Sequence, residues 1–326
     1  MKRTLLVALV LMSTFAARPA GAEPPPPDVV RVMSFNLFHG GDAGKQPFEQ
    51  TMAVIKASRA DVVGLQETAG HAPTKDAERP DRAAKLAQQL GWHYLDQGGR
   101  TGIVSRFKIV GSTPKKWGAR VELPSGRNAY VFNAHFPASP YQPYQLLRIP
   151  YGNAPFITTA EEAVDAARKA RGAQVERMVA EIKSILPEGL PVFVTGDFNE
   201  PSHLDWTAAG VKAGHCPLEV PWPTTKAVEV LGFVDAYRSV HSDPVKQRGL
   251  TWTPTTKLTD PKDRHDRIDF VFVGGAKVTV KAVRIVGENP ELADVVVDLY
   301  PSDHRAVVAE VQLPAEVSAS PKGPAK

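Results

Sequence analysis

The sequence predicts an α/β protein in which mixed β-sheets are covered by helices. With 326 residues, of which 43% are hydrophobic and 23% charged, the chain can bury a large core and has an ordinary globular composition. Strand-like and helix-like patterns alternate along it. Several strand-like runs also follow one another without a helix between them, which implies antiparallel pairing and excludes a purely doubly wound sheet. We therefore predict one domain over residues 29–313.

The segments outside this domain have their own compositions. Residues 1–22 resemble a secretory signal peptide, because two basic residues precede an apolar stretch, Leu5–Phe15, and small residues at 20–22 suit cleavage. The apolar stretch is too short to span a membrane, so we predict export to the periplasm or beyond. Residues 23–28, with four prolines, are expected to form an extended linker, and residues 314–326 a disordered tail.

Charge and cysteine content exclude some classes of protein. Three of the 39 basic residues lie in the leader, which leaves 36 basic residues against 35 acidic ones. This balance gives no strong field for nucleic acids or anionic membranes. Because Cys216 is the only cysteine, no internal disulfide can form, and we expect this side chain to be a small buried hydrophobe.

The first half of the domain begins with two strand-and-helix pairs. Residues 29–37 and 61–66 are short apolar, β-branched runs that predict strands, and residues 48–59 and 82–91 have apolar positions at helical spacing. Strand-like runs then follow directly on one another: Gly102–Ser105, Lys108–Ser112, Ala119–Leu123 and Ala129–Phe136.

The second half begins with a long helix, predicted over Thr159–Leu186. Thr159 and Glu162 form a capping box, and apolar residues recur on one face at Val164, Val175, Met178, Val179 and Ile182. A buried strand follows from Val192. The last predicted strands are Ile268–Val273, Val278–Ile285, Val295–Leu299 and Ala306–Val311.

Polar side chains stand at the strand ends. After the strand at Val192 come Asp197 and Asn199, which would leave an extended chain on the same side. The alternative is an ordinary turn, since Asp and Asn are common turn residues. Comparable polar residues follow or precede other strands: Asn36, Glu67, His135, Asp266 with Asp269, and Asp303 with His304. Each alone fits a turn or cap, but together they would be costly to bury unless paired or bound to a metal.

These side-chain types point to metal-assisted hydrolysis. The oxygen ligands Asn36, Glu67 and Asp303, without a cysteine–histidine cluster, suit Mg²⁺, with Mn²⁺ or Ca²⁺ as alternatives. A histidine oriented by a carboxylate can move a proton. A metal, a histidine and Asp or Asn around one cavity could direct water onto a phosphoester.

The ordered motifs Ser-Phe-Asn-Leu, Leu-Gln-Glu, Asn-Ala-His, Gly-Asp-Phe-Asn, Arg-Ile-Asp-Phe and Ser-Asp-His resemble the endonuclease/exonuclease/phosphatase superfamily, with its deoxyribonuclease-I-like fold. The resemblance spans Ser34 to His304. It implies a four-layer sandwich of two packed mixed sheets flanked by helices, with the site at one end of the sheets. Glu67 would be the principal metal ligand, assisted by Asn36 and Asp303.

The same resemblance implies catalytic roles. His304 would be a general base or a transition-state stabiliser, with Asp269 as its partner and Asp266 as the second candidate for that position. Asp197 would position or deprotonate the attacking water, and whether Asp197 or His304 takes its proton stays open. The remaining residues, Asn199 and His135, would donate hydrogen bonds to phosphate oxygens.

The implied function is that of an exported, Mg²⁺-dependent phosphoesterase. Nuclease activity is favoured over a phospholipid or sphingomyelin phosphodiesterase, with a small-molecule phosphatase third and a non-catalytic phosphate-binding module as the rival. The substrate is the only partner implied, and we expect a monomer. The aromatic and proline-rich loop 138–157 is either a packed surface loop or a substrate-facing lid. Basic residues that could contact phosphates, or form a solvated face, are Arg100, Arg106, Lys108, Lys115, Lys116, Arg120 and Arg127.

Overall fold

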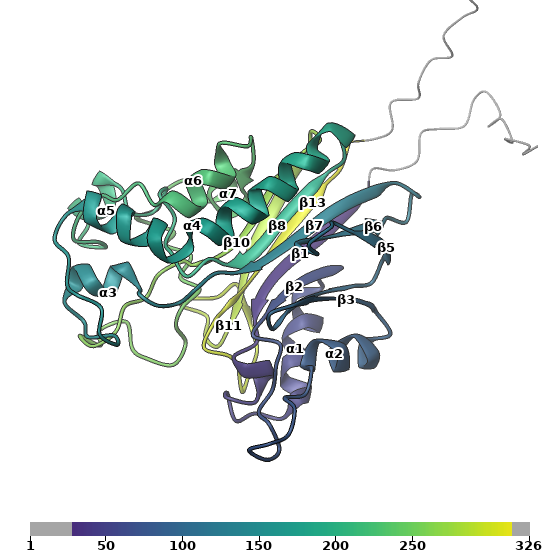
Figure 1. Ribbon diagram of the computed structural model, residues 1–326, viewed down its shortest axis with the longest axis horizontal. Coiled ribbons are helices and arrows are strands. Elements are labelled where there is room, and N and C mark those ends of the chain that lie inside the picture. The colour runs from purple at the N-terminus through teal and green to yellow at the C-terminus, as the bar shows by residue number, and fades with distance from the viewer. Residues whose placement is uncertain (1–27, 315–326) are drawn as a thin grey trace, which may run out of the picture.

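The computed structural model describes residues 28–314 and contains two β-sheets packed face to face (Figure 1). The seven-stranded sheet has the order β12-β11-β13-β1-β2-β4-β3, and the six-stranded sheet has the order β5-β6-β7-β8-β10-β9. The predicted signal peptide, most of the predicted linker and most of the predicted tail lie outside the described residues.

The elements have the following bounds. The strands are β1 (Val29–Asn36), β2 (Val62–Gln66), β3 (His93–Gly98), β4 (Thr101–Ser105), β5 (Lys108–Ser112), β6 (Gly118–Glu122), β7 (Asn128–His135), β8 (Val192–Asp197), β9 (Val234–Asp235), β10 (Asp269–Gly274), β11 (Thr279–Gly287), β12 (Val295–Val296) and β13 (Ala306–Gln312). The α-helices are α1 (Phe48–Ser58), α2 (Arg82–Leu90), α3 (Gln142–Leu147), α4 (Ala160–Ile185), α5 (Ala208–Lys212), α6 (Pro223–Glu229) and α7 (Ala236–Val240), with short 3₁₀ turns at His39–Gly41 and Leu186–Glu188.

The alternation of side chains along the strands divides the core into layers. On β1, Val30 and Val32 face the space between the sheets, whereas Met33 and Phe35 pack in the cluster that contains residues of α1 and α2. The outer face of the six-stranded sheet packs with residues of α4 and α6. Figure 1 shows these two groups of helices on opposite sides of the paired sheets. The predicted four-layer sandwich is therefore confirmed.

Both sheets are mixed, as the sequence predicts. β1 pairs in parallel with β2 and antiparallel with β13, and β7 pairs in parallel with β8, which pairs antiparallel with β10. The predicted capping box at the start of α4 is present, because the Thr159 hydroxyl accepts from the Glu162 N–H and the Glu162 side chain accepts from the Thr159 N–H. Cys216 is buried, as predicted. None of the described helices has the length and apolar character needed to cross a membrane.

Some elements differ from the sequence prediction. The edge strand β3 was not predicted, because its sequence His-Tyr-Leu-Asp-Gln-Gly is polar and its residues are exposed or half-buried. Of the predicted strand Val295–Leu299, only Val295 and Val296 pair. The short elements α3, α5, α6, α7 and β9 also lie in segments where no period was recognised. These pieces are too short for hydrophobic periodicity to identify them.

Gly64 on β2 marks a close approach of the two sheets. A Cβ atom at this position would overlap the hydroxyl oxygen of Thr195 on β8 and lie 2.6 Å from the Asn133 side-chain oxygen. We expect Gly64→Ala to lower the free energy of unfolding by about 1–3 kcal/mol, because the added methyl group overpacks the space between the sheets.

Equilibrium unfolding in urea would measure this effect. The matched control is Gly111→Ala on β5, where a Cβ atom meets nothing within 4 Å. A Gly64→Ala protein as stable as the Gly111→Ala protein would contradict the tight contact between the sheets.

Candidate active site

The site lies where the inter-sheet face of the strands changes from apolar to polar. On β8, Phe193 packs in the core between the sheets, and Thr195 and Asp197 follow it on the same face. The parallel neighbour β7 places His135 opposite Asp197, and the antiparallel neighbour β10 places Asp269 opposite the same residue. Strand register alone therefore gathers three of the predicted site residues.

A buried polar layer separates this cluster from the apolar core. The Gln66 side-chain amide donates to the Asn133 oxygen at 2.6 Å and to the Ser34 hydroxyl at 3.3 Å. The Thr195 hydroxyl lies 3.2 Å from the same Asn133 oxygen, and the Asn133 amide donates to the Gln97 oxygen at 2.8 Å. These contacts join the two sheets. This layer was not predicted from the sequence, although Gln66 and Asn133 lie on the same strand faces as the apolar residues between the sheets.

Asn36 joins two carboxylates of the site. Its amide nitrogen lies 2.9 Å from Asp197 Oδ2 and 3.5 Å from Glu67 Oε1, while its oxygen accepts from the Phe38 N–H at 2.9 Å. The other Glu67 oxygen accepts from the His39 N–H at 3.0 Å. Burial raises the pKa of the Glu67 carboxyl, but the nearby His135 imidazole and the His39 N–H outweigh burial, so that the pKa lies below its usual value.

His304 and Asp269 form a buried pair. The His304 Nδ1 lies 2.9 Å from Asp269 Oδ2, and its Nε2 lies 3.7 Å from Asp197 Oδ2. Burial alone would lower the pKa of His304, but the carboxylates of Asp269, Asp197 and Asp303 outweigh it and raise this pKa well above the usual value. Thr251 supports the pair, because its hydroxyl oxygen accepts from the Asp269 N–H at 3.1 Å.

Asp266, the second candidate for the histidine partner, belongs to a different network. Its carboxylate accepts from the Tyr141 hydroxyl at 2.9 Å and from the Trp206 indole at 3.2 Å, and it pairs with Arg264 at 3.0 Å. The structure therefore places Asp269, and not Asp266, against His304.

The loop 138–157 has both packed and exposed parts. It contains the short helix α3, and the side chains of Tyr141 and Tyr144 are buried. Both rings contact Trp252, whose own ring centre lies 6.4 Å from that of His304. Tyr151 and Phe156, by contrast, are exposed. The first part of the loop is thus a packed wall near the site, and only the second part is free to face solvent.

His135 and Asp303, two further predicted site residues, are half-buried and lie on the solvent side of the cluster. His135 Nε2 lies 3.6 Å from Asp197 Oδ2 and 4.0 Å from Glu67 Oε1. Asp303 Oδ1 lies 3.9 Å from His304 Nε2. Burial, together with the carboxylates of Glu67 and Asp197, raises the pKa of Asp303 to about 6.

Asn199 does not leave the strand beside Asp197 as an extended chain would. Its φ of 48° is left-handed, so the backbone turns directly after β8. The Asn199 N–H donates to Asp197 Oδ1 at 2.9 Å, and its side-chain amide donates to the Phe136 carbonyl at 3.0 Å. The prediction that the two side chains leave an extended chain on the same side was wrong, because a turn follows the strand. Both residues nevertheless lie at the site.

The donor atoms fit a hard divalent cation. Glu67, Asp303 and Asn36 offer oxygens, and Asp303 Oδ1 has no hydrogen-bond partner among residues 28–314. A second group, Asp197, Asp269 and His304, has ligand atoms that all lie within 4.8 Å of one another. In that group Asp269 Oδ2 and His304 Nδ1 bond to each other, and Asp269 Oδ1 has no hydrogen-bond partner in the described part of the chain. Both groups therefore offer donors that suit a divalent cation.

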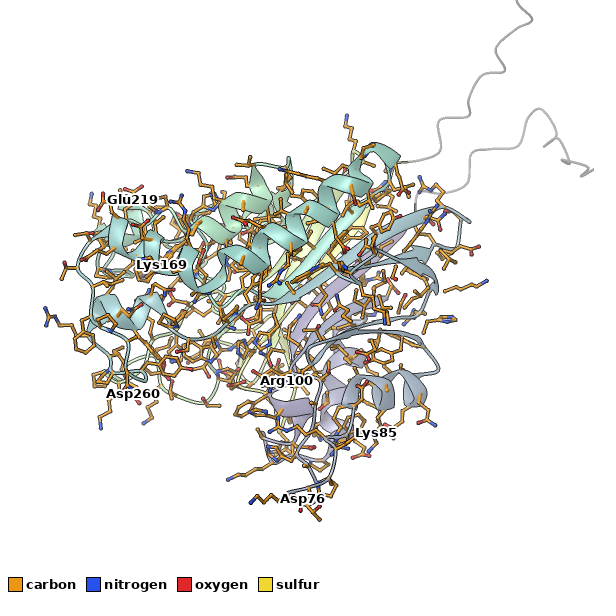
Figure 2. The ribbon with its side chains drawn as sticks, in the orientation of Figure 1. Asp76, Lys85, Arg100, Lys169, Glu219 and Asp260 are labelled. Atoms are coloured by element: carbon orange, nitrogen blue, oxygen red, sulfur yellow. The ribbon has the colours of Figure 1, made fainter. Side chains whose placement is uncertain are left out.

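An open groove of about 990 Å³ begins at Glu67 and His135. It passes the turn between β3 and β4, where Arg100 is labelled in Figure 2, and reaches Arg177 on α4. Of the basic residues considered in the sequence, those that line the groove are Arg100, Lys115 and Lys116.

The other basic residues of that set have different positions. Arg106, Arg120 and Arg127 form ion pairs with acidic residues, at 3.3, 3.6 and 2.9 Å respectively. Lys108 is exposed on β5 and does not line the groove. The solvated-face interpretation therefore describes this second group, and only part of the set could meet a substrate.

Comparisons with known proteins agree with this architecture. A model of the Endonuclease/Exonuclease/phosphatase family matches residues 33–304. An uncharacterized protein of Caenorhabditis elegans, F14F9.5, is 28% identical over 300 residues, which cover 86% of this chain and 90% of that protein. A solved endonuclease/exonuclease/phosphatase from Beutenbergia cavernae has a TM-score of 0.52 at 20% identity, over 87% of this chain and 72% of its own.

The structure of D. rerio TDP2 complexed with single strand DNA product is also similar, with a TM-score of 0.52 at 17% identity over 87% of this chain and 99% of that one. At these identities the structural likenesses show a shared deoxyribonuclease-I-like fold.

Proposed function

This chain belongs to the endonuclease/exonuclease/phosphatase family, and we propose that it is a metal-dependent phosphoesterase that cleaves phosphodiester bonds with water. One observation carries the proposal. Both sheets contribute to a single cluster, in which Asp197 Oδ2 lies 2.9 Å from the Asn36 amide, 3.6 Å from His135 and 3.7 Å from His304. Such a concentration of buried carboxylates and imidazoles is typical of an active site.

The metal has a defined part in this proposal. Glu67, with Asn36 and Asp303, would hold Mg²⁺, and the cation would supply positive charge to the phosphate oxygens. All other steps are assigned to the side chains of the protein.

Asp197 is the proton acceptor in the proposed mechanism. Its carboxylate is held by N–H donors of Asn36 and Asn199, both at 2.9 Å, which fixes it beside the attacking water. His304 is held by Asp269 through Nδ1, so its Nε2–H is directed at a non-bridging phosphate oxygen. His135 is placed to donate a further hydrogen bond on the open side of the cluster.

The groove favours a polymeric substrate over a small phosphate ester. Its open shape and its four basic lining residues, Arg100, Lys115, Lys116 and Arg177, suit a chain with several phosphates. We therefore propose nuclease activity. A phospholipid or sphingomyelin phosphodiesterase is the second candidate, because the exposed Tyr151 and Phe156 could contact a lipid surface.

A substrate panel with and without metal tests the proposal. The purified protein should cleave single-stranded DNA or RNA in Mg²⁺, lose this activity in excess EDTA, and regain it when Mg²⁺ or Mn²⁺ is restored. Circular dichroism in EDTA should be unchanged, because the core does not depend on the cation. Sphingomyelin vesicles and sugar phosphates form the other arms of the panel.

Substitutions in the groove test whether the substrate is a nucleic acid. Lys116→Gln should raise KM for DNA several-fold, whereas Lys108→Gln, an exposed lysine outside the groove, should not. Cleavage of sphingomyelin alone would support the lipid alternative. A folded protein that cleaves nothing in the panel would contradict the proposed hydrolase.

A further inference from the structure

A second cavity, of about 310 Å³, lies apart from the candidate active site. Its walls come from the middle of the loop 138–157, at the end of α3, from the segment after α5, and from the long connection between α7 and β10. The loop that carries Asp260, labelled in Figure 2, forms one side. None of the candidate catalytic or metal-binding residues lines this cavity.

Arg248 is the distinctive residue of this cavity. Its guanidinium makes one hydrogen bond within the described part of the chain, a long one of 3.4 Å to the His265 carbonyl, and no carboxylate of that part lies within 4.0 Å of it. Burial lowers the pKa of this guanidinium. The nearby Arg238 and Arg267, by contrast, both pair with Asp205 at distances below 3 Å. The carboxylates of Asp266 and Asp205 offset part of the burial of Arg248 without contacting it, and a bound anion would offset more of it.

The surroundings of Arg248 leave room for such an anion. Arg248 also lines a neighbouring cavity of about 350 Å³. Arg264 and His215 line the first cavity with it. The one acidic residue there, Asp263, already accepts hydrogen bonds from the Tyr144 and Thr256 hydroxyls.

We propose that this cavity is a binding site for a phosphate group, either inorganic phosphate or a phosphate monoester. Arg248 and Arg264 come from the connection between α7 and β10, and His215 comes from the segment after α5. Arg264 keeps its pair with Asp266 at 3.0 Å, so Arg248 would be the main cationic ligand of a tetrahedral oxyanion. Leu147, Ile149 and Leu258 also line the cavity, and their apolar side chains would accommodate the carbon part of an ester. The site needs no metal and is independent of the proposed hydrolase activity.

Calorimetric titration of the full-length protein in EDTA tests the proposal, with inorganic phosphate and thymidine 5′-monophosphate as probes. Phosphate should bind in the absence of metal. Arg248→Gln should weaken binding by at least about tenfold, the loss expected for a hydrogen-bonded charge pair. The matched control, Arg284→Gln, removes an exposed arginine of β11 and should bind as the unaltered protein does. Tighter binding of the nucleotide would identify a monoester as the ligand, and equal binding would identify the free ion.

Two results would overturn the proposal. The first is the absence of metal-independent phosphate binding by the unaltered protein in the millimolar range, which needs no variant to fold. The second is loss of that binding in His304→Ala but not in Arg248→Gln, since the phosphate would then occupy the catalytic cluster. Full retention in His304→Ala, with loss in Arg248→Gln, would establish the second site.

Discussion

Replacing His304 with alanine is expected to lower kcat for nucleic acid cleavage by about 10²–10⁴-fold, with a much smaller change in KM. The reason lies in its two contacts. Nδ1 is held by Asp269 at 2.9 Å, and Nε2 faces Asp197 at 3.7 Å, where a reacting phosphate would be bound. A side chain that acts on the transition state affects kcat, whereas one that only binds the substrate affects KM.

Asp269, the partner of His304, allows a second test of the same role. Asp269→Asn should also lower kcat, and the double variant with His304→Ala should be no worse than His304→Ala alone, because the pair acts as one unit. His93→Ala on β3, an exposed histidine, is the control and should retain full activity. Thermal unfolding of each variant separates lost activity from lost fold. Additive losses, or full activity in His304→Ala, would contradict the assigned roles.

Glu67→Gln is expected to reduce both the affinity for Mg²⁺ and the rate by about 100-fold or more, since even the residues that support metal ligands contribute 10–100-fold. The substitution keeps the size of the side chain, and the amide oxygen can still accept from the His39 N–H. What is lost is the negative charge next to the cation. Titration with Mg²⁺ in the absence of substrate measures this loss directly.

The matched control is Glu122→Gln, an exposed glutamate on β6, for which Mg²⁺ affinity and rate should not change. Unaltered Mg²⁺ affinity in Glu67→Gln would show that Glu67 is not a ligand. The group of Asp197, Asp269 and His304 would then become the better metal candidate.

Much of the fold follows from local sequence patterns. β1, β2, β7 and β8 read as buried strands because their apolar residues are β-branched or aromatic, and the long helix α4 carries its own capping box. The strand β3 could not be recognised in this way. Its formation depends on antiparallel pairing with β4, which is a tertiary contact.

The site shows the same division between local and long-range information. That acids, amides and histidines end the strands is visible in the sequence. The sequence does not show whether Asp266 or Asp269 is the partner of His304. That depends on the register of β10 against β8, and on Tyr141 and Trp206, which lie far away in the chain and donate hydrogen bonds to Asp266. The turn at Asn199 likewise depends on a contact with the Phe136 carbonyl.

The polar layer formed by Ser34, Gln66, Asn133 and Thr195 has a mechanical consequence. Each half of the catalytic cluster stands on a different sheet, so a slip of one sheet past the other by a single residue would displace the halves by about 3.3 Å. Such a slip would first have to break the buried hydrogen bonds that cross from one sheet to the other, Gln66–Asn133 and Asn133–Gln97. The polar layer thus fixes the position of one sheet relative to the other, so that the catalytic side chains are preorganised before a substrate binds.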